Sequence, residues 1–176
     1  MAQLNQSLAF QSNAILSLAC YGLAQQGGGI VAGAPGSQAW PTANKAIYIP
    51  FRVFDNFTAK RIVIYNHATI NGNVCVAIYN SSSSRLVTSG SVAHAGANAD
   101  QVFDITDTAL VPALYYMGIA FDNNTATIAA VSAAAVSMKQ HKFGVREEAA
   151  AFPLPATATF ADTTLDMLPV MAILGF

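Results

Sequence analysis

Apolar side chains recur at every second position along several short segments in the middle of the chain. Val74, Val76 and Ile78 show this spacing, and Ile62 and Ile64 repeat it. Alternate side chains of a β-strand point to the same face, so the pattern indicates antiparallel strands with one face buried. We expect six strands of ordinary length: Ala46–Val53, Lys60–Asn66, Asn73–Asn80, Arg85–Ser91, Ala99–Ile105 and Leu114–Asp122.

Turn-forming residues separate these segments. Asn71-Gly72 can supply the positive φ of a tight turn, and the residues from Asn80 to Ser84 join a hairpin. We expect Asp107-Thr108 and Val111-Pro112 to form a loop before the last of the six strands. Short strands with frequent turns predict an all-β fold, with an antiparallel β-sandwich over residues 45–128.

The segment before the sandwich has a different character. Residues 1–44 contain no charged side chain, and the glycines of Gly27–Gly29 and of Ala34–Gly36 interrupt regular structure. We therefore expect an extended N-terminal arm. A free arm with this much Leu, Ile and Phe would be prone to aggregation, so it should pack on its own domain or on a neighbour.

The segment after the sandwich, residues 129–176, is expected to form an apolar tail that completes the sandwich or contacts a neighbouring subunit. Ala129–Met138 fits either a helix or a strand, whereas Lys139–Glu148 holds much of the charge of the chain and should be exposed. Thr157–Phe160 and Val170–Leu174 are predicted to be the final strands.

Few side chains in the sequence are charged. Apolar residues make up 53% of the chain and charged residues 10%, against about 25% charged in ordinary soluble domains. A neutral surface opposes association only weakly, so we expect a homo-oligomer, for example a trimer. The net charge of −1 comes without a basic cluster, so no nucleic-acid partner is expected. No apolar run approaches the roughly 20 residues of a membrane span, so no membrane partner is expected.

One group of carboxylates is a candidate for chemistry. It consists of Asp100, Asp104, Asp107 and Asp122. Acids on the loops of a sandwich can bind Ca²⁺ or include a glycosidase acid pair, which needs a defined carboxylate separation. Asp107 and Asp122 flank turns, where Asp bonds to its own backbone, and this structural role is the interpretation we favour.

The histidines and cysteines do not form a known motif. His67, His94 and His141 lack the spacing of zinc ligands, and Cys20 and Cys75 are interpreted as buried thiols. The sequence also lacks a nucleophile elbow and a phosphate-binding glycine loop. We therefore expect no enzymatic activity, no cofactor and no metal.

Four residues are the candidate ligand contacts. Tyr115 and Tyr116 are consecutive in a predicted strand, so they should point to opposite faces and leave one ring exposed. An exposed tyrosine ring can stack on a sugar while its hydroxyl stays in water. Asp122 and Asn123, in the turn that follows, could add hydrogen bonds to a glycan.

Two stretches of sequence carry a family resemblance. Gly72–Asn80, followed by Arg85–Val87 and Ser89–Ser91, resembles a hairpin of jelly-roll domains in virion proteins of tailed bacteriophages. Leu110–Tyr116 is similar to a later strand of the same domains. The resemblance covers residues 44–128. The chain departs from the family pattern at the hairpin turn and at Ala113, which replaces a glycine.

This resemblance implies a scaffold and no active site. It implies a non-enzymatic structural protein of the virion, either a capsid decoration (cement) protein or a tail-associated protein. Its partners would be the major capsid or tail proteins, and its location would be the virion, assembled in the host cytoplasm. The alternative is a receptor- or carbohydrate-binding module of a tail fibre, whose partner would be a host glycan.

Overall fold

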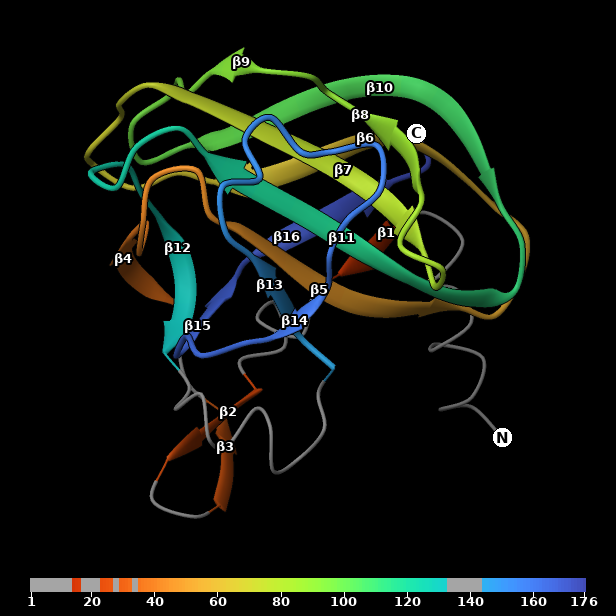
Figure 1. Ribbon diagram of the computed structural model, residues 1–176, viewed down its shortest axis with the longest axis horizontal. Helices are drawn as coiled ribbons and strands as arrows, with labels where there is room; N and C mark the ends of the chain where they lie inside the picture. The colour runs from red at the N-terminus through yellow and green to blue at the C-terminus, as the bar shows by residue number, and fades with distance from the viewer. Residues whose placement is uncertain (1–13, 17–22, 27–28, 33–34, 133–143) are drawn as a thin grey trace.

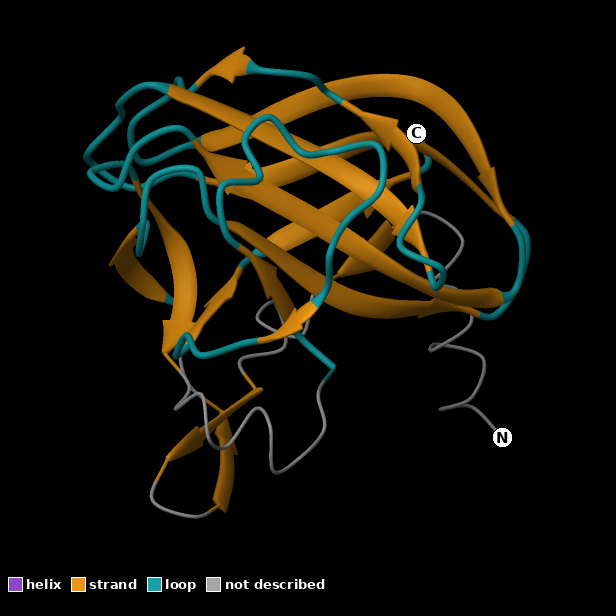
Figure 2. Cartoon of the chain, in the orientation of Figure 1, coloured by secondary structure: helices purple, strands orange, loops and turns teal. Residues whose placement is uncertain are grey.

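The protein is described by a computed structural model that covers residues 14–16, 23–26, 29–32, 35–132 and 144–176. All of the regular elements within these residues are β-strands, and every strand pair is antiparallel (Figures 1 and 2). The predicted all-β, antiparallel sandwich is therefore confirmed.

Two sheets form the body of the sandwich. The four-stranded sheet has the order β1 (Ala14–Leu16), β16 (Met171–Leu174), β6 (Phe57–Tyr65) and β10 (Asp100–Leu110). The seven-stranded sheet runs β14 (Ala161–Asp162), β13 (Arg146–Glu148), β5 (Ala46–Val53), β11 (Ala113–Phe121), β7 (Asn73–Asn80) and β8 (Arg85–Thr88), with β9 (Val92–Ala93) also paired to β7. Figure 1 shows β10 and β6 lying across β7 and β11.

Two smaller sheets complete the described part of the chain. One has the order β15 (Met167–Pro169), β12 (Thr127–Ser132) and β4 (Gly36–Ala39), and the other pairs β2 (Leu23–Gln26) with β3 (Gly29–Ala32). Trp40, which follows β4, is buried and packs against Phe121 with ring centroids 4.8 Å apart. Part of residues 1–44 therefore contributes to the core.

The core lies between the two large sheets. Ile62, Ile64 and Phe103 face inward from the four-stranded sheet, and Ile78 and Ile119 meet them from the seven-stranded sheet. Burying such side chains contributes about 1.5–3 kcal/mol each, so this layer stabilises the fold. The central strands β7 and β11 are buried on both faces, which explains why they contain so few polar residues.

Most strand predictions agree with the structure. Ala46–Val53 and Asn73–Asn80 have the predicted bounds, and Val170–Leu174 differs from β16 by one residue. The predicted turns are also present: Gly72 has φ 61°, and the Asn80 N–H donates to the Ser84 carbonyl at 3.0 Å. Ala129–Met138 begins as a strand, since β12 continues to Ser132, and its remaining residues lie outside the described ones.

Three predictions about local structure are wrong. Asp107-Thr108 is not a loop, because β10 continues to Leu110 and absorbs the irregularity as a shift in register after Asp104. Thr157–Phe160 is not a strand, since Thr157 makes one isolated bridge to Ser84. Glu147, expected to be exposed within Lys139–Glu148, is buried.

Candidate functional site

The two candidate tyrosines do point to opposite faces of β11, but neither ring is exposed. Tyr115 faces the core, where its ring stacks on Phe51 at 5.6 Å and its hydroxyl donates to the Val111 carbonyl at 3.0 Å. Tyr116 faces the other way and is covered by Phe160 at 4.6 Å. The expected exposure of one tyrosine is therefore wrong, and β11 presents no aromatic platform to solvent.

Asp122 and Asn123 lie together and bond to the chain around them. Asp122 accepts hydrogen bonds from the backbone N–H of Asn73 at 2.9 Å and from the Asn123 amide at 2.8 Å. Partial burial raises the pKa of Asp122, but the hydrogen bonds from Asn123 and Asn73 outweigh it, and the pKa lies below its ordinary value. A side chain at Gly72 would place its Cβ 2.1 Å from the Asp122 carboxylate, so this turn requires glycine.

The other candidate acids do not join Asp122. Asp104 pairs with Arg61 at 2.8 Å and Asp107 with Lys60 at 3.9 Å, both on the exposed side of the four-stranded sheet. Within the described residues, no group of three or more His, Cys, Asp or Glu side chains could hold a metal ion.

The histidines and cysteines are separate from one another. His94 is buried with its ring against Phe121 at 4.9 Å, whereas the ring of His67 contacts that of Tyr65 at 5.6 Å. Cys75 is a buried free thiol, as predicted. Cys20 and His141 lie outside the described residues.

The outer face of the seven-stranded sheet is covered by the chain itself. We call residues 151–160 the covering segment; its side chains pack on small and aromatic residues of β5, β7 and β11. Phe160 contacts the rings of Tyr48, Tyr79 and Tyr116. Gly118 lies beneath these rings, where an added Cβ would be 3.1 Å from both Tyr48 and Tyr79.

Polar groups hold the covering segment in place. The Tyr48 hydroxyl donates to Glu148 at 2.6 Å, the Tyr79 hydroxyl donates to the Pro155 carbonyl at 2.6 Å, and Arg85 donates to the Leu154 carbonyl. Burial raises the pKa of both tyrosines well above the ordinary value. These phenols are therefore neutral hydrogen-bond donors. Both hydroxyls already donate to acceptors of the same chain.

Among the described residues, no segment covers the outer face of the four-stranded sheet over its three longest strands, β16, β6 and β10. Ala172 of β16, Val63 of β6 and Val102 of β10 are cross-strand neighbours, so they form an apolar row across the sheet. Val102 is 52% exposed. Other exposed apolar residues, such as Phe54 and Val111, lie on the loops between β5 and β6 and between β10 and β11.

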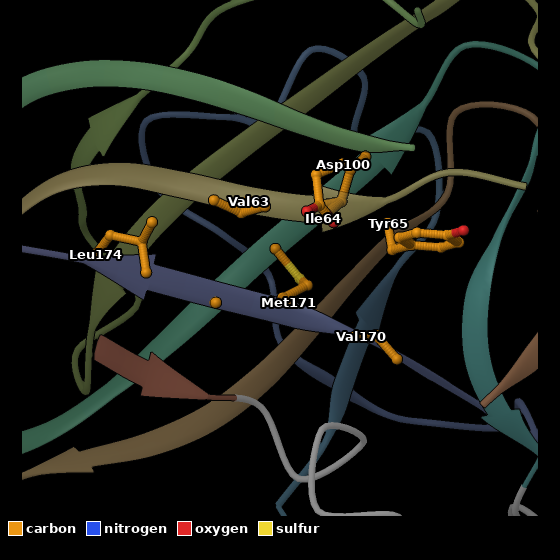
Figure 3. A pocket seen from close by; sticks show the side chains of 8 residues that line it. Val63, Ile64, Tyr65, Asp100, Val170, Met171 and Leu174 are labelled. Atoms are coloured by element: carbon orange, nitrogen blue, oxygen red, sulfur yellow. The ribbon is translucent and has the colours of Figure 1, made fainter. Parts of the chain in front are cut away.

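A groove of about 290 Å³ runs along this face. It is lined by Val63, Ile64, Tyr65, Asp100, Val170, Met171, Ala172 and Leu174. Figure 3 shows that these side chains come from β6, β10 and β16 and from Val170 just before β16, with Asp100 at one border and Leu174 toward the far end of β16. We call this surface, together with Val102, the open face.

Charges lie only at the borders of the open face among the described residues of these strands. Arg61 bridges Asp104 and the Phe176 carbonyl, at 2.8 and 2.7 Å, on one side of the apolar row. Tyr65 and Asp100 are paired in register on the other side. This order, with an apolar centre and a polar rim, is the usual composition of a protein interface.

The sequence offered one signal for this face that we did not interpret. Val63 lies between Ile62 and Ile64, so β6 is apolar on both faces at this point, as a strand is where it is covered on both sides. The described part of the structure covers one side only.

Comparison with known proteins leaves the fold and this surface as the basis for assigning a function. No protein-family model matches the chain, and no curated protein sequence matches it. Within the described residues, no helix is long and apolar enough to cross a membrane.

Proposed function

We propose that this chain is a non-enzymatic structural component of a tailed-bacteriophage virion. It would be a capsid decoration (cement) protein or a tail-associated protein that binds neighbouring virion subunits. The resemblance of Gly72–Asn80 and Leu110–Tyr116 to jelly-roll virion proteins supports the virion location. The open face supports the binding role, and it is the observation on which the proposal rests.

The two outer faces of the sandwich differ in how their apolar area is covered. Apolar area contributes about 25 cal/mol per Å² when it leaves water, and the seven-stranded sheet obtains this from the covering segment. The open face, with Val63 and Val102, would gain the same stabilisation by burying its apolar area against a neighbouring subunit. Repetition on a symmetric lattice would then add avidity to each weak contact.

Labelling of assembled particles tests this function. Phage particles produced from the genome that encodes the chain would be incubated with gold-labelled antibody against the protein and imaged by electron microscopy. Regular gold on the capsid or on the tail is the expected result. Purified particles without gold, and without the protein by mass spectrometry, would contradict the proposal.

A carbohydrate-binding module of a tail fibre is the second candidate. It has one observation in its favour: the ring of Tyr65 borders the groove and is 36% exposed, with Asp100 beside it. The aromatic ring can stack on a sugar, and the carboxylate beside it can accept hydrogen bonds from the sugar hydroxyls.

A glycan array separates the two candidates. The module predicts binding that is lost in Tyr65→Ala and kept in Leu86→Ala, an exposed position on β8 away from the groove. The structural role predicts no glycan binding by either variant or by the wild-type chain.

A further inference from the structure

Strand β1 shows where the chain before Ala14 leaves the four-stranded sheet. Ala14 pairs with Leu174 and Leu16 pairs with Ala172, in antiparallel register. The backbone direction of β1 at Ala14 therefore points past Leu174, away from the end of the groove that Val170 lines. To reach the groove of its own copy, the preceding chain would have to turn back over the sheet. To reach a neighbouring copy, it need only continue.

The amino-acid composition of residues 1–13 matches the open face. This segment contains no Asp, Glu, Lys, Arg or His, and its large apolar side chains include Leu4, Leu8 and Phe10. Burying such a segment on Val63 and Val102 would remove no ionised side chain from water, and burial of ions is the costly part of forming a dry interface. Its Gln, Ser and Asn side chains could bond to the polar rim.

The length of the segment is sufficient. Thirteen extended residues span roughly 43 Å at about 3.3 Å per residue, whereas neighbouring strands of a sheet lie about 4.8 Å apart. The segment is therefore several times longer than the distance from β16 to β10. Reach does not limit exchange between copies that lie side by side.

The outer edge of β10 is protected against strand addition. Asp100, Asp104 and Asp107 all lie on this edge strand, and its register with β6 shifts between Asp104 and Thr108. Charges and irregularities on an edge strand oppose pairing with a further strand. A bound segment is therefore expected on the face of the sheet, over Val63 and Val102, and not along its edge.

We propose that the open face of one copy receives residues 1–13 of a neighbouring copy of this chain. The inference rests on the proposed structural function, and it names the partner of the open face. Each copy would donate one segment and accept one, so the exchange closes into a two-fold dimer or a ring, or continues through a lattice. Leu4, Leu8 and Phe10 would supply the apolar anchors.

Photo-cross-linking of the full chain tests the inference. Phe10 is replaced by p-benzoylphenylalanine, isotope-labelled and unlabelled copies are mixed in equal amounts, and the cross-linked peptides are identified by mass spectrometry after irradiation. The expected cross-links join residue 10 of one isotope to peptides containing Val63, Val102 or Ala172 of the other. Cross-links confined to a single isotope would place the segment on its own copy and overturn the proposal, as would cross-links to other surfaces.

Two variants make the test specific. Val102→Lys should abolish the mixed-isotope cross-links, because a charged side chain would replace an apolar one in the apolar row and would have to lose its water when the segment bound. Leu86→Lys, an exposed position of the other sheet, should leave them unchanged. Both variants should unfold at the wild-type temperature, since both side chains are exposed. Equal loss in the two variants, or no loss in Val102→Lys, would overturn the proposal.

The outcome is distinguishable from failure of the proposed function. Copies that exchange residues 1–13 in purified protein but are absent from phage particles would refute the virion role alone. A chain that is present in particles, yet shows no mixed-isotope cross-link in purified form, would refute the exchange and leave the virion role standing.

Discussion

The two large sheets of this sandwich have outer faces that differ in one respect. The seven-stranded sheet is covered by residues 151–160, which bring Leu154 and Phe160 onto Tyr48 and Tyr79. The four-stranded sheet presents Val63 and Val102 without a cover among the described residues. Both faces have apolar side chains, but among the described residues only the face of the seven-stranded sheet is covered and belongs to the core.

The polar contacts of the two faces explain this difference. On the covered face, the buried hydroxyls of Tyr48 and Tyr79 each have an acceptor supplied at or beside the covering segment. On the open face, the hydrogen-bonding groups of Arg61 and Asp104 are at the rim and bond to each other. The first arrangement stabilises one permanent partner from the same chain. The second leaves the centre dry and free of unpaired groups, which suits a separate subunit.

The largest effect should come from weakening the covered face. Leu154→Ala removes a side chain that is 1% exposed, and it should lower the free energy of unfolding by about 2–5 kcal/mol. The exposed leucine Leu86 provides the matched control, because Leu86→Ala should change stability by less than about 0.5 kcal/mol. Urea unfolding of both variants measures the difference. Equal losses would show that the covering segment does not contribute to the core.

A smaller loss of stability should follow from removing the polar contacts that flank the covering segment. Glu147 lies just before the covering segment and Thr164 lies just after it. The Glu147 carboxylate accepts hydrogen bonds from Lys45 at 3.2 Å and from the Thr164 N–H at 2.9 Å. Glu147→Gln should cost about 1–3 kcal/mol near neutral pH. Asp104→Asn is the control, since that carboxylate is 84% exposed and should matter little.

The pH dependence of Glu147 has a defined sign. Burial raises the pKa of Glu147, but hydrogen bonds from Thr164 and Lys45 outweigh it, so the folded pKa lies below the ordinary value. The stabilisation is therefore complete above the ordinary pKa of about 4.3, and it is lost as pH falls from there through the folded pKa. Unfolding of Glu147→Gln at several pH values should show a weaker acid dependence than the wild-type protein.

His94 should make the stability of the sandwich sensitive to mild acid. Burial lowers the pKa of His94, and its contact with Asn71 does not offset this. As pH decreases from the ordinary pKa of about 6.5 to the lower folded pKa, the free energy of unfolding should fall by up to about 1.4 kcal/mol per pH unit. His94→Gln should remove this slope in thermal unfolding, whereas His67→Gln should retain it. A slope that survives in His94→Gln would place its origin elsewhere.

The smallest effect on stability, and the largest on association, should come from the open face. Val102→Lys changes an exposed side chain, so the free energy of unfolding should stay within about 0.5 kcal/mol of the wild-type value. Sedimentation velocity of the purified full chain should show an oligomer for the wild type and a smaller species for Val102→Lys. Unchanged sedimentation together with normal stability would remove the distinction between the two faces.

The strands of the sandwich could be predicted because their pattern is local. Ala46–Val53 and Asn73–Asn80 carry β-branched and aromatic residues between clear turns, and the structure gives them the predicted bounds. The predicted strand Thr157–Phe160 has a similar composition. It lies on top of a sheet instead of pairing within one, and that choice depends on distant residues such as Tyr79 and Gly118.

The candidate site could not be predicted for the same reason. Strand geometry correctly placed Tyr115 and Tyr116 on opposite faces, but their exposure depends on whether another segment covers each face. Phe160, distant in sequence, covers Tyr116. The alternation of Ile62 and Ile64 already places Val63 on the opposite face of its strand, but only the pairing of β6 with β10 and β16 brings it into one apolar row with Val102 and Ala172.

Competitive incorporation into particles tests the central claim most directly, namely that the open face binds a neighbouring subunit. Equal amounts of wild-type chain and Val102→Lys chain would be supplied during phage assembly, and their ratio in purified particles measured by mass spectrometry, with Leu86→Lys as the matched control. Val102→Lys should be depleted about tenfold or more, which corresponds to about 1.4 kcal/mol of lost binding, whereas Leu86→Lys should not. Equal incorporation of the two variants would contradict it.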